Sequence, residues 1–133
     1  MYVTKRNTED LTQENRALTI LASAVRAASN NSDDQKNRDA KGLHLIIDVT
    51  VVPGVDTVTF TVKGKDPLSG KYYTLLASAA LVATGTVVLK VYPGLTAAAN
   101  LVASDVLPAD WRVEVTHSAG TNFTYSVGAQ LVG

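Results

Sequence analysis

The region from Leu43 to Val132 alternates hydrophobic and polar residues at a period of two in several short segments. Thr57–Lys63 reads Thr-Val-Thr-Phe-Thr-Val-Lys, and Trp111–His117 reads Trp-Arg-Val-Glu-Val-Thr-His. Each segment places apolar side chains on one face and Thr or charged side chains on the other, which is the pattern of a half-buried strand. The pattern predicts strands at Leu43–Val52, Thr57–Lys63, Lys71–Ala80, Thr86–Tyr92, Trp111–His117 and Phe123–Leu131.

Residues that favour turns separate these segments. Pro53-Gly54 and Pro93-Gly94 each end a strand, and the loop Gly64–Gly70 supplies glycine, proline and aspartate for a chain reversal. Ser118–Asn122 predicts a hairpin between the last two strands. Short strands at this spacing predict an all-β fold, an antiparallel β-sandwich of the jelly-roll or Ig-like kind.

Two segments are harder to interpret. Leu95–Pro108 is irregular, although Ala97–Ala99 is compatible with a short helical turn. Ala17–Ala28 fits either element, because its apolar residues match a helical face and a strand face equally well. Its alanine content favours a helix, whereas its Thr, Ile and Val residues favour a strand. Periodicity alone leaves helix and strand open here.

Charge divides the chain into two parts. Residues 1–42 contain 13 of the 24 charged residues, and the remaining 11 are spread over more than twice that length. The first residues are polar and offer little to bury. We therefore expect a polar N-terminal arm over residues 1–16 and a single β-sandwich domain over residues 17–133.

The overall composition excludes several classes of function. Twelve basic and twelve acidic residues leave no net charge, which argues against nucleic-acid binding by phosphate neutralisation and against a polybasic membrane anchor. No apolar run approaches the ~20 residues that span a bilayer, so we expect no membrane partner. The chain has no cysteine, which excludes disulfides and thiolate chemistry and is compatible with synthesis in a reducing cytoplasm.

Candidate reactive groups are few and show no motif. A catalytic zinc site would need His44 and His117 together with a carboxylate such as Asp48 or Glu114, and their spacing is not that of a metal motif. Ser69 lacks the leading glycine of a nucleophile elbow. The carboxylates of the strand region lie mostly near turns, where aspartate caps backbone amides. We expect no catalytic residues, no metal site, no cofactor and no enzymatic activity.

Aromatic side chains offer one alternative. Tyr72, Tyr73, Tyr92 and Trp111 are candidates for a sugar-binding platform, but they also suit core and sheet-face packing. The neighbours Tyr72 and Tyr73 should face opposite sides of their strand. Trp111 begins an alternating apolar face, so we expect it in the core.

Five blocks of the sequence stand out by their order and spacing, and together they cover roughly the last 92 residues: Gly42–Thr50, Gly64–Leu76, Val91–Thr96, Leu107–Val113 and Thr124–Ala129. With these blocks the chain resembles a family of small virion proteins of tailed bacteriophages. The resemblance implies no enzymatic activity and carries no catalytic residues over. It also implies that Ala17–Ala28 is an extended strand leading into the sheet.

The resemblance implies a role in capsid decoration, in which a small β-sandwich cements neighbouring capsomers from outside the shell. The implied location is the capsid surface of the virion, the implied partner is the major capsid protein of the same phage, and a homo-oligomer on the shell is allowed. Two alternatives stay open. One is a tail, neck or fibre component of the virion, and the other is a carbohydrate-binding module that uses Tyr72, Tyr73 and Tyr92.

The arm supplies the candidate contacts with a capsid. Its apolar residues have no obvious partner within the arm, and two basic residues lie among them. Apolar anchors should matter more than charge, because exposed ion pairs contribute only about 0–1 kcal/mol each. The predicted contact residues are Tyr2, Val3, Lys5, Arg6 and Leu11.

Overall fold

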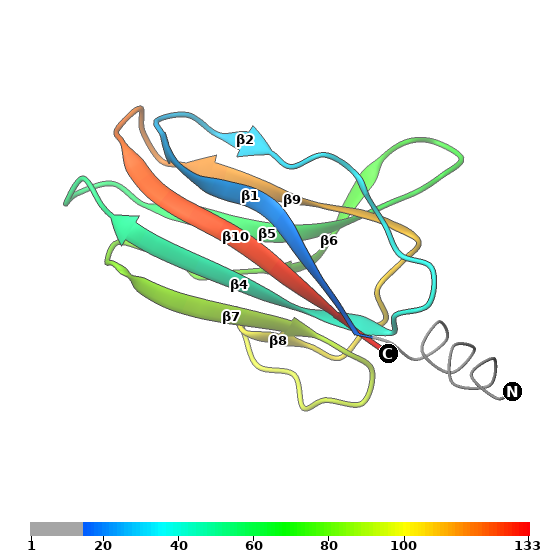
Figure 1. Cartoon of the computed structure of the whole chain (residues 1–133). Coiled ribbons are helices and arrows are strands. Elements are labelled where there is room, and N and C mark those ends of the chain that lie inside the picture. Colours follow the sequence, from blue (N-terminus) through cyan, green and yellow to red (C-terminus); the bar gives the residue numbers. More distant parts are fainter. Residues whose placement is uncertain (1–14) are drawn as a thin grey trace, which may run out of the picture.

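Two packed β-sheets form the protein, as a computed structural model that describes residues 15–133 shows (Figure 1). One sheet, called sheet A here, has the strand order β1-β10-β4-β7-β8. Its strands are β1 (Arg16–Arg26), β4 (Gly42–Val51), β7 (Gly85–Val91), β8 (Val102–Ala103) and β10 (Phe123–Val132). The described residues contain no helix.

The second sheet, sheet B, has the order β2-β9-β5-β6, with β3 also paired to β9. Its strands are β2 (Asn30–Asn31), β3 (Gln35–Lys36), β5 (Val58–Lys65), β6 (Tyr72–Ala77) and β9 (Asp110–His117). All pairings are antiparallel except that of β7 with the two-residue strand β8, which is parallel. The predicted all-β sandwich is therefore confirmed, with one short parallel pair added.

The strand order decides between the two kinds of sandwich that the sequence left open. Sheet A contains β1, β10, β4 and β7 in this order, and sheet B contains β2, β9, β5 and β6 in this order. Each of these strands is consecutive in the chain with the strand at the same position in the other sheet, so that β1 corresponds to β2 and β10 to β9. Consecutive strands thus face each other across the core, as in a jelly roll. The order is not that of an Ig-like sandwich.

The predicted hairpin through Ser118–Asn122 is wrong. Although β9 and β10 are consecutive, β9 pairs with β5, β2 and β3 in sheet B, whereas β10 pairs with β1 and β4 in sheet A. The connection carries the chain from one sheet to the other. A turn signal shows where the chain reverses, and it does not show whether the two strands then pair or pack face to face.

The two ambiguous segments are now assigned. Of the segment Ala17–Ala28, the residues up to Arg26 are extended in β1, which confirms the predicted strand, and register shifts on either side of Leu21 interrupt its pairing with β10. Ala97–Ala99 forms no helical turn. Instead Ala98 makes an isolated bridge to Val102, just where β8 begins.

The core lies between the sheets and is filled by the inward residues of the alternating strands. In β5, β9 and β10 every second side chain is buried, as the sequence pattern predicts. Trp111 is completely buried, which confirms its predicted place in the core. Burial of each large aliphatic side chain contributes about 1.5–3 kcal/mol.

Close packing also fixes the start of β4. A Cβ atom on Gly42 would lie 2.0 Å from the carbonyl oxygen of Val91, so only glycine fits this position. Gly70 has a different requirement, because it ends the β5–β6 turn with a φ of 75°.

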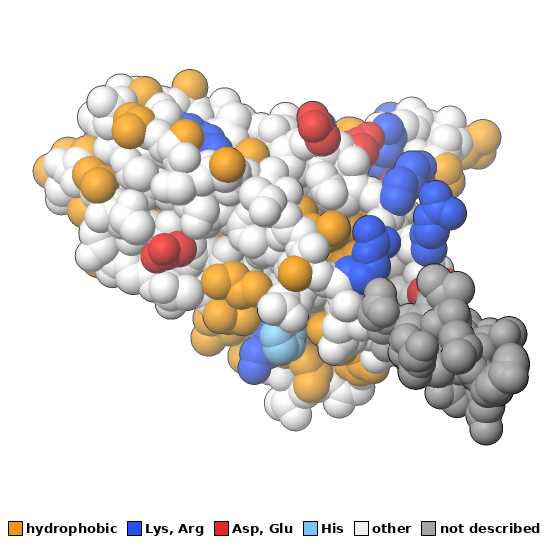
Figure 2. Space-filling model, viewed as in Figure 1, with side chains coloured by type: hydrophobic (Ala, Val, Ile, Leu, Met, Phe, Trp, Pro, Cys, Tyr) orange, Lys and Arg blue, Asp and Glu red, His pale blue; other side chains and the backbone are white. Residues whose placement is uncertain are grey.

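The two ends of the sandwich differ in their surface chemistry. Figure 2 shows hydrophobic side chains at the left-hand end and a concentration of Lys and Arg side chains at the right-hand end. We call the left-hand end the loop end; it consists of residues 27–29, 52–57, 78–84 and 118–122. We call the opposite end, which includes the β5–β6 turn and residues 37–41, the hairpin end.

Candidate functional site

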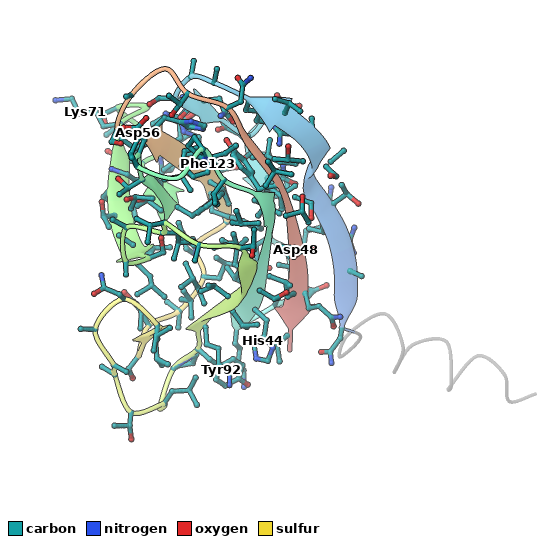
Figure 3. The ribbon with its side chains drawn as sticks, turned by 90° about the vertical axis from the view of Figure 1, so that its left-hand side faces the viewer. His44, Asp48, Asp56, Lys71, Tyr92 and Phe123 are labelled. Atoms are coloured by element: carbon teal, nitrogen blue, oxygen red, sulfur yellow. The ribbon has the colours of Figure 1, made fainter. Side chains whose placement is uncertain are left out.

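The two histidines that a zinc site would need do not come together. His44 is exposed on the outer face of sheet A, whereas His117 is buried at the end of β9 in sheet B. Figure 3 shows His44 and Asp48 on β4. No group of three or more potential metal ligands exists within residues 15–133.

His117 belongs instead to a buried polar cluster under the loop end. Its Nε2 lies 2.8 Å from the hydroxyl oxygen of Tyr125, and Asn30 Nδ2 donates to the same hydroxyl at 2.9 Å. The tyrosine hydroxyl accepts from Asn30, and it can donate its own hydrogen to a neutral imidazole. The cluster joins β2, β9 and β10, and so connects the two sheets.

The surroundings of His117 keep it neutral. Burial lowers the pKa of His117 and the Arg26 guanidinium lowers it further, while a backbone contact at Thr121 acts weakly in the opposite direction. Burial likewise raises the pKa of the Tyr125 hydroxyl. Both groups are therefore uncharged at neutral pH, as a structural polar cluster requires.

Arg26 closes this cluster from the edge of sheet A. Its Nη1 donates to the Tyr125 carbonyl at 2.9 Å, and its Nη2 donates to the Ala22 carbonyl at 2.6 Å. The guanidinium carbon lies 4.8 Å from the centre of the Tyr125 ring. Its charge is thus used inside the fold, and it holds the irregular end of β1 against β10.

A second set of interacting side chains covers the outer face of sheet B. Lys65 Nζ lies 2.8 Å from Asp34 Oδ2, and the Tyr72 hydroxyl donates to Asp34 Oδ1 at 2.7 Å. Arg112 lies over the Tyr72 ring, 3.6 Å from its centre, and donates to Glu114 Oε2 through Nη2 at 2.7 Å. The charges on this face neutralise one another.

These contacts explain the pKa shifts on that face. The hydrogen bond from Lys65, together with that from Tyr72, lowers the pKa of Asp34, and the pairing raises the pKa of Lys65. Both groups are solvent-exposed, so the arrangement is a surface network and not a tuned acid or base.

Ser69 and Asp66 serve the β5–β6 turn. The Ser69 hydroxyl donates to Asp66 Oδ2 at 2.7 Å, and the Leu68 amide donates to Asp66 Oδ1 at 3.1 Å. These hydrogen bonds lower the pKa of Asp66. The pair makes a turn motif, in agreement with the capping role expected for turn aspartates.

The aromatic candidates do not form a shared platform. Trp111 is in the core. Tyr72 pairs with Lys65 and Tyr73 with Gly64, so they point to opposite sides of β6, as predicted. Tyr73 is on the core side but remains 46% exposed at the end of the sheet. Tyr92 follows β7 in the other sheet, where its hydroxyl donates to the Gly133 carbonyl at 2.9 Å.

The outer face of sheet A is the least charged broad face of the sandwich. On the central strands β4, β7 and β10, the only titratable side chains that point to this outer face are those of His44, Asp48 and Lys90. Between them, Ile46 pairs with Val88 on one side and with Gly128 on the other. The centre of this face is therefore uncharged.

The sequence did not reveal the roles of Arg26, Asn30 and Tyr125. The alternation of apolar and polar residues in β10 does predict that Tyr125 points inward. The sequence does not predict that β2 pairs with β9, because β2 consists of two polar residues, which give no recognisable strand pattern. The predicted contact residues Tyr2, Val3, Lys5, Arg6 and Leu11 lie outside the described residues.

No helix within residues 15–133 is long and apolar enough to cross a membrane. Comparisons with known proteins find no matching protein-family model and no matching curated protein.

Solved structures of infectious bursal disease virus contain similar chains. In the structure of the Gx strain the TM-score is 0.50 at 9% sequence identity, with 90% of this chain and 32% of that chain covered. In the structure of the Gt strain the TM-score is 0.41 at 13% identity, with 92% of this chain and 34% of that chain covered. This protein thus spans about a third of the length of those chains. At 9% identity, the first likeness concerns the β-sandwich fold alone.

Proposed function

We propose that this protein is a structural component of a virion, and that it decorates and cements the outer surface of a phage capsid. The observation that carries the proposal is its jelly-roll strand order, a fold that viral capsid and lectin domains use. The likeness in fold to a chain in the structure of the Gx strain of infectious bursal disease virus supports it. So does the resemblance of residues 42–133 to small virion proteins of tailed bacteriophages.

The chemistry of the surface fits adhesion better than catalysis. The charged side chains on the outer face of sheet B pair with one another, and the polar cluster around His117 is buried. A rigid sandwich of this kind would contribute many small contacts across a broad surface. Multiple copies on one particle would then offset weak individual contacts. The alternative of a carbohydrate-binding module is less well supported, because Tyr72, Tyr73 and Tyr92 do not lie on one face.

The proposed partner is the major capsid protein, and the proposed contacts of the arm are Tyr2, Val3, Lys5, Arg6 and Leu11. We propose that the arm, residues 1–16, adds to adhesion, whereas the strand region folds without residues 1–14. Removing residues 1–14 should therefore leave the melting temperature nearly unchanged and weaken binding to undecorated capsids. A large fall in the melting temperature would mean that these residues belong to the core.

The test of the function is made on particles. Purified virions from the strain that encodes the protein should contain it at a fixed ratio to the major capsid protein, by quantitative mass spectrometry. Cryo-electron microscopy should place it outside the shell, and deletion of its gene should lower the temperature at which particles rupture. Location in the tail or neck would support the alternative virion role. Absence from particles would overturn the proposal.

A further inference from the structure

The loop end presents an apolar surface with almost no charge. Its four loops come from distant parts of the sequence, and they contain a single charged residue, Asp56. Thr121 Oγ1 donates to Asp56 Oδ2 at 2.6 Å, so this carboxylate already has a partner within the end. The opposite end contrasts with this, since residues 36–41 alone include Lys36, Arg38, Asp39 and Lys41.

Exposed valines lie in these loops and at the adjoining ends of β1 and β4. Val25 on β1 pairs with Thr124, and Thr124 pairs with Val51 on β4, so the two valines flank one threonine across sheet A. Val25 is 62% exposed, and Val51 and Val82 are each more than half exposed. Val55 projects furthest, at 84% exposed. Several exposed apolar side chains at one end of a molecule mark an interaction site more often than a single exposed side chain does.

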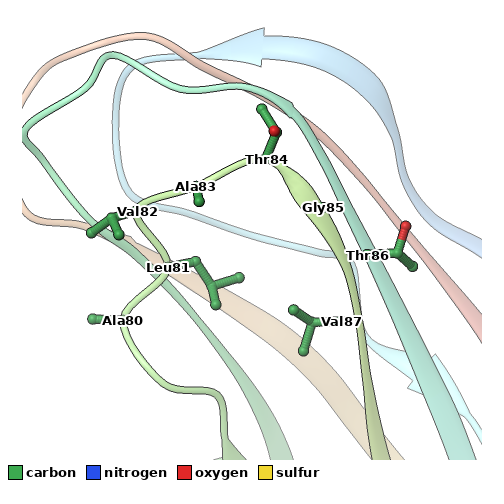
Figure 4. A pocket seen from close by; sticks show the side chains of 8 residues that line it. All are labelled: Ala80, Leu81, Val82, Ala83, Thr84, Gly85, Thr86 and Val87. Carbon is green, nitrogen blue, oxygen red and sulfur yellow. The ribbon is translucent and has the colours of Figure 1, made fainter.

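The same end contains a hollow. It is lined by residues 80–87, has a volume of about 350 Å³, and takes its apolar walls from Leu81, Val82 and Val87 (Figure 4). Leu81 in the wall of the hollow forms an isolated β-bridge with Val58, the first residue of β5. Val58 follows Val55 by three residues, so the hollow lies close to the loop that carries Val55. A projecting valine and an apolar hollow thus occur on neighbouring loops of one chain.

We propose that the loop end is a self-association surface, and that Val55 of one copy enters the hollow of a second copy while the reverse contact forms at the same time. A symmetric contact needs a surface that complements itself, and a projection beside a hollow provides this. The absence of lysine and arginine from the four loops disfavours an acidic partner or an anionic lipid surface. A second loop end contains the same single charged residue, Asp56, whose carboxylate is hydrogen-bonded to Thr121, so the pairing brings no other charged side chain of the four loops into the contact.

This inference is independent of the proposed function, because it concerns the purified protein. Sedimentation equilibrium from low micromolar to millimolar concentration should show the apparent mass rising from that of a 14.0 kDa monomer towards twice that value. Added sodium chloride should leave the association intact, because apolar contacts are not screened.

Matched variants locate the contact. Val55→Asp and Val82→Asp each place a charge in the proposed interface, and each should abolish the concentration-dependent rise in mass. Leu68→Asp is the control, since Leu68 is 94% exposed in the β5–β6 turn, and it should associate as the unaltered protein does. Because all three sites are on the surface, circular dichroism should show unchanged folding.

Three results would overturn the proposal. They are a monomer at every concentration, association that survives both loop-end variants, and equal loss of association in Leu68→Asp. A protein that stays monomeric but sediments with neutral phosphatidylcholine vesicles, and loses this in Val55→Asp, would identify the loop end as a lipid-binding surface instead.

Discussion

The loop end and the hairpin end of the sandwich place their polar groups in opposite ways. At the loop end His117, Tyr125 and Asn30 form hydrogen bonds in the interior, while valines occupy the surface. At the hairpin end Trp111 fills the interior, and lysines and carboxylates pair on the outside.

The difference shows how an uncharged surface can be held in a fixed shape. Surface ion pairs are absent from the four loops of the loop end, so buried interactions beneath these loops must hold their backbone in place. The fully partnered Tyr125 hydroxyl and the Arg26 guanidinium supply that support by joining β1, β2, β9 and β10. The hairpin end is held mainly by hydrophobic packing, and its exposed charges add little stability.

The largest expected effect is at the core of the hairpin end. Trp111→Ala should lower the free energy of unfolding by about 3–5 kcal/mol, because a large buried side chain leaves a cavity. Chemical denaturation followed by circular dichroism measures this. Trp111→Phe should cost clearly less, since the indole Nε1 has no hydrogen-bond partner among residues 15–133. An exposed, red-shifted tryptophan fluorescence in the native protein would contradict the burial.

A smaller effect is expected at the polar cluster of the loop end. Tyr125→Phe keeps the ring and removes the hydroxyl, which leaves His117 Nε2 and one hydrogen of the Asn30 amide without their partner. Unsatisfied buried groups cost about 1–3 kcal/mol, so the free energy of unfolding should fall by that amount. Thr124→Val on the outer face of the same strand is the control and should have little effect. Equal stability of Tyr125→Phe and the unaltered protein would show that the cluster contributes nothing.

The two ends should also differ in the pH range over which they contribute to stability. The folded protein lowers the pKa of His117 below its ordinary value of ~6.5, so the unfolded chain binds the proton more readily. Stability should be fully present above pH ~6.5 and should be lost progressively as the pH falls from there towards the lowered folded value.

Urea denaturation at a series of pH values around neutrality and below measures this slope. His117→Gln should flatten it, because glutamine does not titrate. The carboxylates of the hairpin end with lowered pKa values, Asp34 and Asp66, lose their contribution only at more acidic pH. A slope that is unchanged in His117→Gln would place the titrating group elsewhere.

The smallest effect is expected on the charged outer face near the hairpin end. Arg112→Gln removes the contact with the Tyr72 ring and the ion pair with Glu114. A cation–π contact that solvent still reaches contributes about 0.5–1 kcal/mol, and the half-buried ion pair, which solvent also reaches, adds little to it. The free energy of unfolding should fall by about 1 kcal/mol or less, and high salt should reduce the difference. A loss comparable to that of Trp111→Ala would show that this face supports the core.

Much of the fold was predictable, because alternation is a local property of the sequence. The strands around Val62, Val113 and Val127 follow from their period of two, and the same period places Trp111 inside. The β5–β6 reversal was also readable from Asp66, Ser69 and Gly70, since turn residues act on their own backbone.

The candidate surfaces were less predictable. The charged residues of β5 and β9 can be seen in the sequence, because they alternate with apolar residues along each strand. Which of these charged side chains lie next to each other depends on the register that pairs Lys63 with Arg112, and the sequence of one strand does not specify this register. The loop end was not predictable at all, because Val25, Val51, Val55 and Val82 come from three separate segments. Only the packed sandwich brings them together.

By itself, then, the sequence determined that the chain forms short alternating strands, that their inward faces are apolar, and that Trp111 lies in the core. The tertiary structure alone decided which strands are neighbours. It placed β9 and β10 in different sheets, paired β1 with β10, and arranged the sheets as a jelly roll. The physical reason is that side-chain alternation is set by backbone geometry within a few residues, whereas strand pairing is chosen by contacts between residues far apart in the chain.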